Sequence, residues 1–232
     1  MSVSTEPAVV AQTSARGLLR PLAAVAVVAV VLGQLLGLVQ TGVAPGGDPA
    51  NDPVYDKVLA DHGSMWLWPV GGIGNLLAAA ATAFAVLVLV TTCGNGRGPR
   101  WAWAGAALLC LAGPLLAAGM GGAGILYYAA GDTRALAPAA GRTLLHHVNH
   151  QGGLDGAFVL PGLLALLLGL IVAAVALLRS RAVDWWLPAV LLVSTVASFV
   201  VDHGLGGALV TLPGAAVTVL LCLRSRQALS EN

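Results

Sequence analysis

Long uncharged apolar runs, separated by short segments that contain arginine or aspartate, dominate the pattern along this chain. A helix that crosses a hydrocarbon core of about 30 Å needs roughly 20 mainly apolar residues, and each run approaches or exceeds that length. Asp202-His203-Gly204 divides the last run into two shorter ones. The pattern therefore predicts about six transmembrane helices, over residues 21–39, 66–92, 101–128, 157–178, 185–201 and 205–223.

These spans predict an all-α fold, a polytopic membrane helical bundle over residues 21–223 with tails at residues 1–20 and 224–232. Pro21 suits the first position of the first helix, where no N–H is needed. The first apolar run is longer than the roughly 7–15 residues of a signal-peptide core. We therefore interpret it as a span and not as a cleaved leader.

Basic residues are strongly biased to one side of a six-helix arrangement. Eight of the eleven precede the first helix, follow the last, or lie in the second-to-third and fourth-to-fifth connections: Arg16, Arg20, Arg97, Arg100, Arg179, Arg181, Arg224 and Arg226. The other side carries three basic residues and seven aspartates: Lys57, Arg134, Arg142, Asp48, Asp52, Asp56, Asp61, Asp132, Asp155 and Asp202. Because cytoplasmic segments are enriched in lysine and arginine, both termini are predicted to be cytoplasmic.

Composition supports the lipid bilayer as the main surroundings of the chain. Hydrophobic residues make up 58% of the sequence and charged residues only 9%, against about 25% charged residues in soluble domains. The net charge of +1 gives no basis for a nucleic-acid partner. The excess of alanine and glycine, with ten arginines to one lysine, favours a high-GC bacterium and hence a bacterial plasma membrane.

Two longer connections are predicted on the outer side, at about residues 40–65 and 129–156. Residues 53–60 and 144–150 within them have the composition of short surface helices, and neither connection is large enough for an independent domain. Eight aromatic residues lie at predicted span ends, where their rings favour the headgroup region: Trp66, Trp68, Trp101, Trp103, Tyr127, Tyr128, Trp185 and Trp186.

All five histidines fall on the predicted outer side. His146 and His150 are four residues apart, so they would share one face of a helix, as a pair of metal ligands does. His62 or His203 would supply a third nitrogen for zinc or copper. The candidate metal ligands are therefore His62, His146, His150 and His203, although the sequence contains no established metal-binding motif. The alternatives are a pH-responsive cluster and histidines that simply face water or lipid headgroups.

Each predicted hairpin repeats one small pattern, in which an Asx-His pair precedes a proline of the incoming helix. The pairs are Asp61-His62, Asn149-His150 and Asp202-His203, and the prolines are Pro69, Pro161 and Pro213. Transporters often contain such internal repeats. The simpler interpretation is that the Asx residue caps the incoming helix.

No charged residue falls inside a predicted span, and catalytic motifs are absent from the sequence. The polar residues within the spans are expected to act as interhelical hydrogen-bond partners: Gln34, Asn75, Ser194, Thr195 and Ser198. The glycine-rich helix over residues 101–128 contains Pro114 and is expected to be the central, tightly packed one. The three cysteines are dispersed and are interpreted as packing residues.

Two local features carry a resemblance to other proteins. The first is Val58-Leu59-Ala60-Asp61, which leads into the second helix. The second is Leu177-Leu178-Arg179-Ser180-Arg181, followed by Trp185-Trp186. In this layout the chain resembles uncharacterised multipass membrane proteins of high-GC bacteria. The resemblance covers most of the chain at the level of topology, and it implies a multipass fold without a particular activity.

Two functional hypotheses follow. The favoured one is a non-enzymatic membrane protein with a structural, accessory or partner-binding role, because the spans contain neither charge nor a catalytic motif. Its candidate partners in the lipid bilayer are another membrane protein or further copies of itself, as a homo-oligomer. The alternative is a small-solute or ion transporter. A bundle without a cavity would support the first, whereas a water-filled cavity lined by Gln34, Asn75 and the Ser194 face of its helix would count strongly against it.

Overall fold

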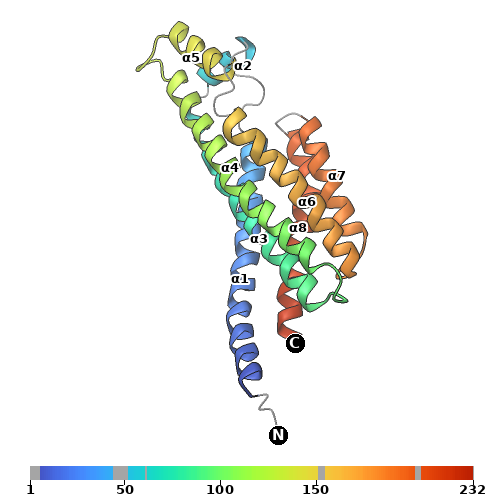
Figure 1. Cartoon of the computed structure of the whole chain (residues 1–232). Helices are drawn as coiled ribbons and strands as arrows, with labels where there is room; N and C mark the ends of the chain where they lie inside the picture. Colours follow the sequence, from blue (N-terminus) through green and yellow to red (C-terminus); the bar gives the residue numbers. More distant parts are fainter. Residues whose placement is uncertain (1–5, 44–51, 61, 151–154, 202–204, 232) are drawn as a thin grey trace.

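A computed structural model describes residues 6–43, 52–60, 62–150, 155–201 and 205–231, and every element in these ranges is helical (Figure 1). The elements are α1 (Glu6–Val43), α2 (Asp52–Ala60), η1 (His62–Trp66), α3 (Leu67–Thr92), α4 (Pro99–Gly131), α5 (Pro138–His150), η2 (Asp155–Val159), α6 (Leu160–Ser180), α7 (Trp186–Val200) and α8 (Leu205–Glu231). The predicted all-α fold is confirmed for the described residues.

Five helical stretches are long and apolar enough to cross a membrane: Gly17–Val43, His62–Thr92, Pro99–Gly131, Gly156–Ser180 and Leu205–Glu231. Large apolar side chains cover their outer faces, as Val28 (65% exposed), Ile125 (67%) and Leu209 (65%) illustrate. Exposed apolar surface of this extent is typical of contact with lipid. The fold is therefore compatible with an integral membrane protein.

The fifth predicted span corresponds to α7, which has only 15 residues. At 1.5 Å per residue its length is roughly 22 Å, less than a hydrocarbon core of about 30 Å. It packs against α8 and α6.

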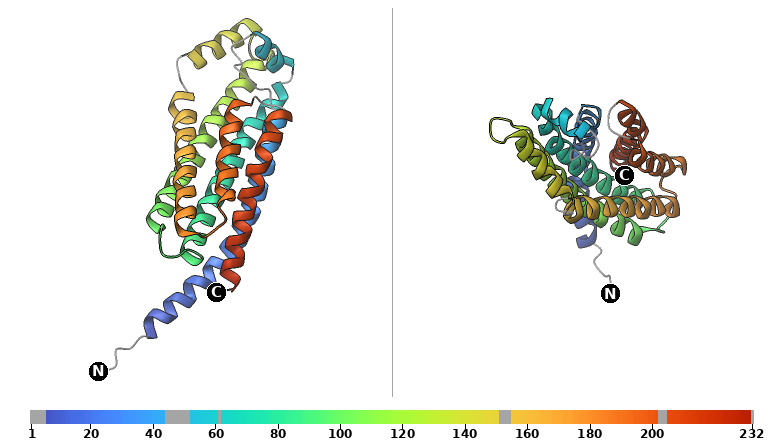
Figure 2. Two further views of the ribbon diagram at one scale, coloured as in Figure 1. Left: turned by 90° about the vertical axis from the view of Figure 1, so that its right-hand side faces the viewer. Right: turned by 90° about the horizontal axis from the view of Figure 1, so that it is seen from above.

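The helix α1 begins, and α8 ends, at the same end of the bundle (Figures 1 and 2), which we call the terminal end. The opposite end carries α2 and α5 and is called the distal end.

The helices α1 and α8 both extend beyond the first and last predicted spans. The helix α1 begins at Glu6 and continues through Pro21, and its first part projects beyond the bundle (Figure 2). The helix α8 continues to Glu231 instead of ending at residue 223. The two extensions meet where the Arg20 Nε donates to the Leu229 carbonyl at 3.0 Å. Parts of both predicted tails are thus helical.

The centre of the bundle is formed by α3 and α4 together. The helix α3 packs against α1, α4 and α8, while α4 packs against α3 and α6. Glycines permit the closest approaches: a Cβ added to Gly33 of α1 would lie 2.6 Å from the carbonyl oxygen of Gly74, and one on Gly105 would lie 2.9 Å from the backbone nitrogen of Ala173. The expected tight packing of the glycine-rich helix α4 is confirmed, and α3 shares its central position.

At the distal end α2 and α5 pack together over the bundle (Figure 1), so both predicted short outer helices are present. Tyr55 of α2 is fully buried, and its hydroxyl donates to the carbonyl of Pro138 at 2.7 Å. The guanidinium of Arg142 lies 4.8 Å from the centre of the Tyr55 ring and pairs with Asp56 at 3.2 Å. These contacts join the two long connections into one cap.

A polar cavity in the helix bundle

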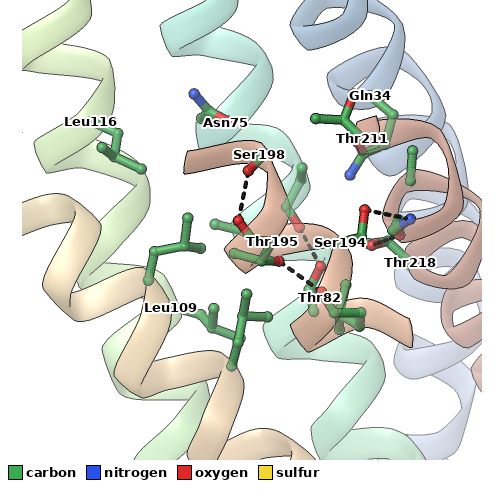
Figure 3. A pocket seen from close by; sticks show the side chains of 17 residues that line it. Gln34, Asn75, Thr82, Leu109, Leu116, Ser194, Thr195, Ser198, Thr211 and Thr218 are labelled. Carbon is green, nitrogen blue, oxygen red and sulfur yellow. Dashed lines mark hydrogen bonds between the residues drawn. The ribbon is translucent and has the colours of Figure 1, made fainter. Parts of the chain in front are cut away.

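A cavity of about 180 Å³ lies among α1, α3, α4, α6, α7 and α8 (Figure 3). Since one water molecule needs roughly 10–15 Å³ of such space, the cavity admits several. All five polar residues that the sequence placed inside the spans line it, together with further hydroxyl and apolar side chains: Gln34, Asn75, Thr82, Leu109, Leu116, Leu166, Leu170, Leu191, Ser194, Thr195, Ser198, Thr211 and Thr218. The lining includes Gln34, Asn75 and Ser194, the three positions whose shared, water-filled cavity was expected to count against a purely structural bundle.

The cavity has a polar side and an apolar side. Leucines of α4 and α6, including Leu109 and Leu116, form the apolar side, whereas the amides and hydroxyls come from α1, α3, α7 and α8 (Figure 3). None of the described lining residues is charged. The walls therefore match a small molecule that combines polar groups with apolar surface.

Most of the lining hydroxyls donate their proton to a backbone carbonyl of their own helix. Thr82 donates to Ala78 at 2.6 Å and Thr195 donates to Leu191 at 2.8 Å. Ser198, Thr211 and Thr218 donate in the same way at 2.7–2.9 Å. A hydroxyl whose proton is engaged retains lone pairs and can only accept further hydrogen bonds. This wall is therefore suited to a ligand that offers O–H or N–H groups.

Two side-chain amides, those of Asn75 and Gln34, line the cavity. The Nδ2 of Asn75 donates to the sulfur of Met120 at 3.2 Å, which leaves its second N–H as a donor and its carbonyl oxygen as an acceptor. Gln34 lines the cavity from α1. The expectation of interhelical hydrogen bonds thus holds for Asn75 and for Ser194, which contacts α8, whereas Thr195 and Ser198 bond within α7.

A second chamber of about 300 Å³ adjoins the first on its distal side. The two share Asn75, Leu116, Leu166, Thr195, Ser198 and Thr211 as lining residues. The second also reaches Gln40 near the end of α1, Trp68 near the start of α3 and Val201 at the end of α7. The chambers together form a polar path that leads from the middle of the bundle towards its distal end.

Sequence reasoning missed several residues of this path. Thr82, Thr211 and Thr218 were not singled out, although a hydroxyl within an apolar span was the available signal. Gln40 was assigned to an outer connection because the first span was ended at residue 39, whereas α1 continues to Val43. Trp68 was interpreted as an interfacial anchor, but it lines the chamber and packs edge-on against the buried Tyr127.

The candidate metal ligands are only partly placed by the structure. His62 lies in η1, with its ring 5.6 Å from the ring of Tyr128, and His146 lies exposed on α5. The side chain of His150, and His203 as a whole, lie outside the described residues. Among the side chains that are described, no group of three histidine, cysteine or acidic residues could hold a metal ion. The zinc or copper site that includes His150 and His203 stays a prediction.

The simple interpretation of the Asx-His pattern was wrong at Asn149, whereas Asp61, which directly precedes η1, lies outside the described residues. The N-cap of α3 is Trp66 and that of α6 is Val159, and neither makes a side-chain capping bond. Asn149 belongs to α5 and does not precede α6 directly. The elements η1 and η2 stand between these Asx residues and the following long helices. The third position, Asp202, lies outside the described residues.

No protein-family model, curated protein or solved structure matches the chain.

Proposed function

We propose that this protein is a multipass membrane protein that conducts or carries a small, uncharged, polar solute through the centre of its bundle. The single observation that carries the proposal is the uncharged polar cavity lined by Gln34, Asn75 and Ser194. Close packing is the rule in protein interiors, where voids larger than a water molecule are few. A cavity that gathers the polar residues of several spans is better explained by a ligand than by a scaffold role.

The absence of charge from the described lining favours a neutral solute over an ion. Transfer of an unpaired ion from water into an apolar medium costs far more free energy than transfer of a hydrogen-bonded hydroxyl or amide. The described walls offer hydroxyl and amide groups but no carboxylate, lysine or arginine. A small polyol or amide would replace its bonds to water with bonds to these groups.

Interrupted helices beside the cavity support the proposal further. Transporter binding sites are typically formed by short or Gly/Pro-interrupted membrane helices. The helix α7 is short, and α8 contains Pro213 within its length, followed by Gly214 at the cavity wall. Pro69 and Pro161, by contrast, lie within the first turns of α3 and α6, so the three hairpins differ in this respect.

We further propose six spans, with the terminal end facing the cytoplasm of a bacterial cell. The start of α1 and the end of α8 lie at the same end of the bundle (Figure 1), which supports an even number of crossings with α7 as the sixth. Seven of the eight arginines that set the predicted orientation have described side chains, and the positive-inside bias supports this assignment. The short α7 crosses if the bilayer thins locally, which costs little per ångström of mismatch.

The test is solute flux into liposomes that contain the purified full chain. Swelling under gradients of acetamide, urea and glycerol should exceed that of empty vesicles for at least one solute, while potassium and chloride fluxes stay at background. Rates equal to those of empty vesicles across the panel would refute the proposal, and ion flux without solute flux would favour an ion pathway instead.

A matched pair of variants on α3 ties any flux to the cavity. The hydroxyls of Thr82 and Thr91 both donate to the carbonyl four residues earlier, at 2.6 and 2.7 Å. Thr82 lines the cavity whereas Thr91 lies exposed near the end of the helix. Thr82→Val should slow solute flux several-fold, because it removes an acceptor from the wall, and Thr91→Val should leave it unchanged. If both substitutions changed the flux equally, the solute would not pass through the cavity.

A further inference from the structure

Gln40 occupies an unusual position in the distal chamber. It lies in the last turns of α1, is only 4% exposed, and lines the chamber together with Trp68 and Thr41. Among the described residues, its Nε2 has no hydrogen-bond partner. A buried donor left without an acceptor costs free energy, so native interiors seldom contain one unless water or a ligand supplies the missing oxygen.

The backbone of α3 at Gly71 lies very close to the Gln40 side chain. A Cβ added to Gly71 of α3 would lie 2.6 Å from the Cγ of Gln40 and 3.0 Å from its Cδ. Only a glycine at position 71 therefore leaves room for the glutamine as it stands. One turn before Gln40 on α1, a Cβ on Gly37 would meet nothing within 4 Å, so the chamber stays open on that side.

Three hydroxyls of the chamber complement the unpaired donor. Thr195, Ser198 and Thr211 each donate to their own helix, so towards the chamber their oxygens can only accept. Gln40 supplies the opposite function, an N–H that requires an acceptor. A ligand that satisfies both the Gln40 donor and the hydroxyl acceptors must carry an acceptor oxygen and at least one O–H or N–H group. A small amide or polyol carries both.

We propose that Gln40 binds the carbonyl or hydroxyl oxygen of a small neutral solute in the distal chamber and so determines which solutes enter the central cavity. This inference rests on the proposed function, since it assigns the first binding position on the same path. A cation fits less well, because the Gln40 N–H dipole would face it with its positive end.

The decisive variant is Gln40→Met, which keeps the approximate shape of the side chain and removes the donor. Without solute, the melting temperature should stay unchanged or rise, because an unpaired buried donor has been removed. Gln40→Met should lose the thermal stabilisation that acetamide or glycerol gives the wild-type chain in detergent. The half-saturation concentration for liposome uptake should rise about five- to tenfold, the effect of one lost hydrogen bond. The exposed Gln227 gives the control, since Gln227→Met should match the wild type in every assay.

Each outcome separates this inference from the proposed function. A marked fall in the solute-free melting temperature of Gln40→Met would assign Gln40 a structural role and overturn the inference. The inference would also be overturned if Gln40→Met kept wild-type half-saturation while Thr82→Val slowed uptake, although the proposed function would stand. Solute-dependent stabilisation that requires Gln40 but is accompanied by no flux would support the binding site and refute transport. As a second variant, Gly71→Ala should displace Gln40 and weaken solute binding to a similar extent.

Discussion

The hydroxyl of Ser194 in α7 lies between two backbone groups of α8: it accepts from the N–H of Gly214 at 3.1 Å and donates to the carbonyl of Val210 at 2.7 Å. An uninterrupted α-helix pairs these two groups directly, since they are four residues apart. A Cβ on Gly214 would lie 2.9 Å from the Ser194 Oγ, so the glycine permits the approach. An inserted side chain of this kind is a known cause of helix bending. It occurs at the cavity wall, next to Pro213.

The first prediction concerns Ser194→Ala. The N–H of Gly214 and the carbonyl of Val210 can pair with each other once the serine hydroxyl is gone, so the loss of unfolding free energy should stay below about 1 kcal/mol. Solute uptake should nevertheless fall several-fold, because the cavity wall loses a hydroxyl and the two hydrogen bonds between α7 and α8 are lost. Thermal melting and liposome uptake measure the two effects. Ser225→Ala is the matched control, since that buried serine of α8 bonds within its own helix, to Cys222, and does not line the cavity. Wild-type uptake by Ser194→Ala would contradict the prediction.

Helix packing gives a second prediction, from two glycines of α4. Gly105→Ala should lower the unfolding free energy by about 1–3 kcal/mol, as overpacking in a tight core does, because the new methyl would approach the backbone of Ala173 at 2.9 Å. Gly121→Ala should be neutral or slightly stabilising, since nothing lies within 4 Å of its added Cβ and alanine favours a helix. Thermal unfolding in detergent compares the two variants. Equal stability would show that α4 and α6 are less closely packed than described.

The third prediction is a loss of stability of the distal cap at alkaline pH. Burial raises the pKa of Tyr55 above its ordinary value of 10.0, against an opposing effect of the Arg142 guanidinium. Because the folded pKa exceeds the unfolded one, the stabilisation is fully present below about pH 10 and is lost as the pH rises through the folded pKa. The wild-type melting temperature should therefore fall more steeply above pH 10 than that of Tyr55→Phe.

At neutral pH, Tyr55→Phe should itself lose about 1 kcal/mol, the usual contribution of one hydrogen bond, here the bond to Pro138. Tyr128→Phe serves as the control, because that ring is 47% exposed. If Tyr55→Phe retained the alkaline slope of the wild type, the titration would have to belong to another group.

The fourth prediction concerns topology and uses cysteine labelling. Cys93 is exposed at the terminal end, after α3, and Lys57 is exposed on α2 at the distal end. An impermeant maleimide added to intact cells should label Lys57→Cys but should reach Cys93 only after permeabilisation. Ser230→Cys, close to the end of α8, should behave like Cys93 if α7 crosses the membrane. If the maleimide labelled Ser230→Cys in intact cells, α7 would not cross the membrane and the protein would have five spans.

The sequence by itself determined the helical class, the approximate positions of the apolar helices and the two short distal helices. These features depend on local patterns, since the length of an apolar run and the residues at its ends are read directly along the chain. Boundaries were less well determined, because a helix continues through Pro21 and through Arg224 and Arg226 where later contacts stabilise it.

Only the tertiary structure decided that the polar residues of the spans converge. Gln34, Asn75 and Ser194 were visible as polar positions in apolar runs, but they lie on three helices far apart in the sequence, and their meeting at one cavity depends on how those helices cross. The glycines set these crossings, because Gly33 and Gly74 allow α1 and α3 to touch, and which glycine meets which backbone is a property of the packed bundle. The buried and unpaired amide of Gln40 likewise arises only once α3 presents Gly71 to it.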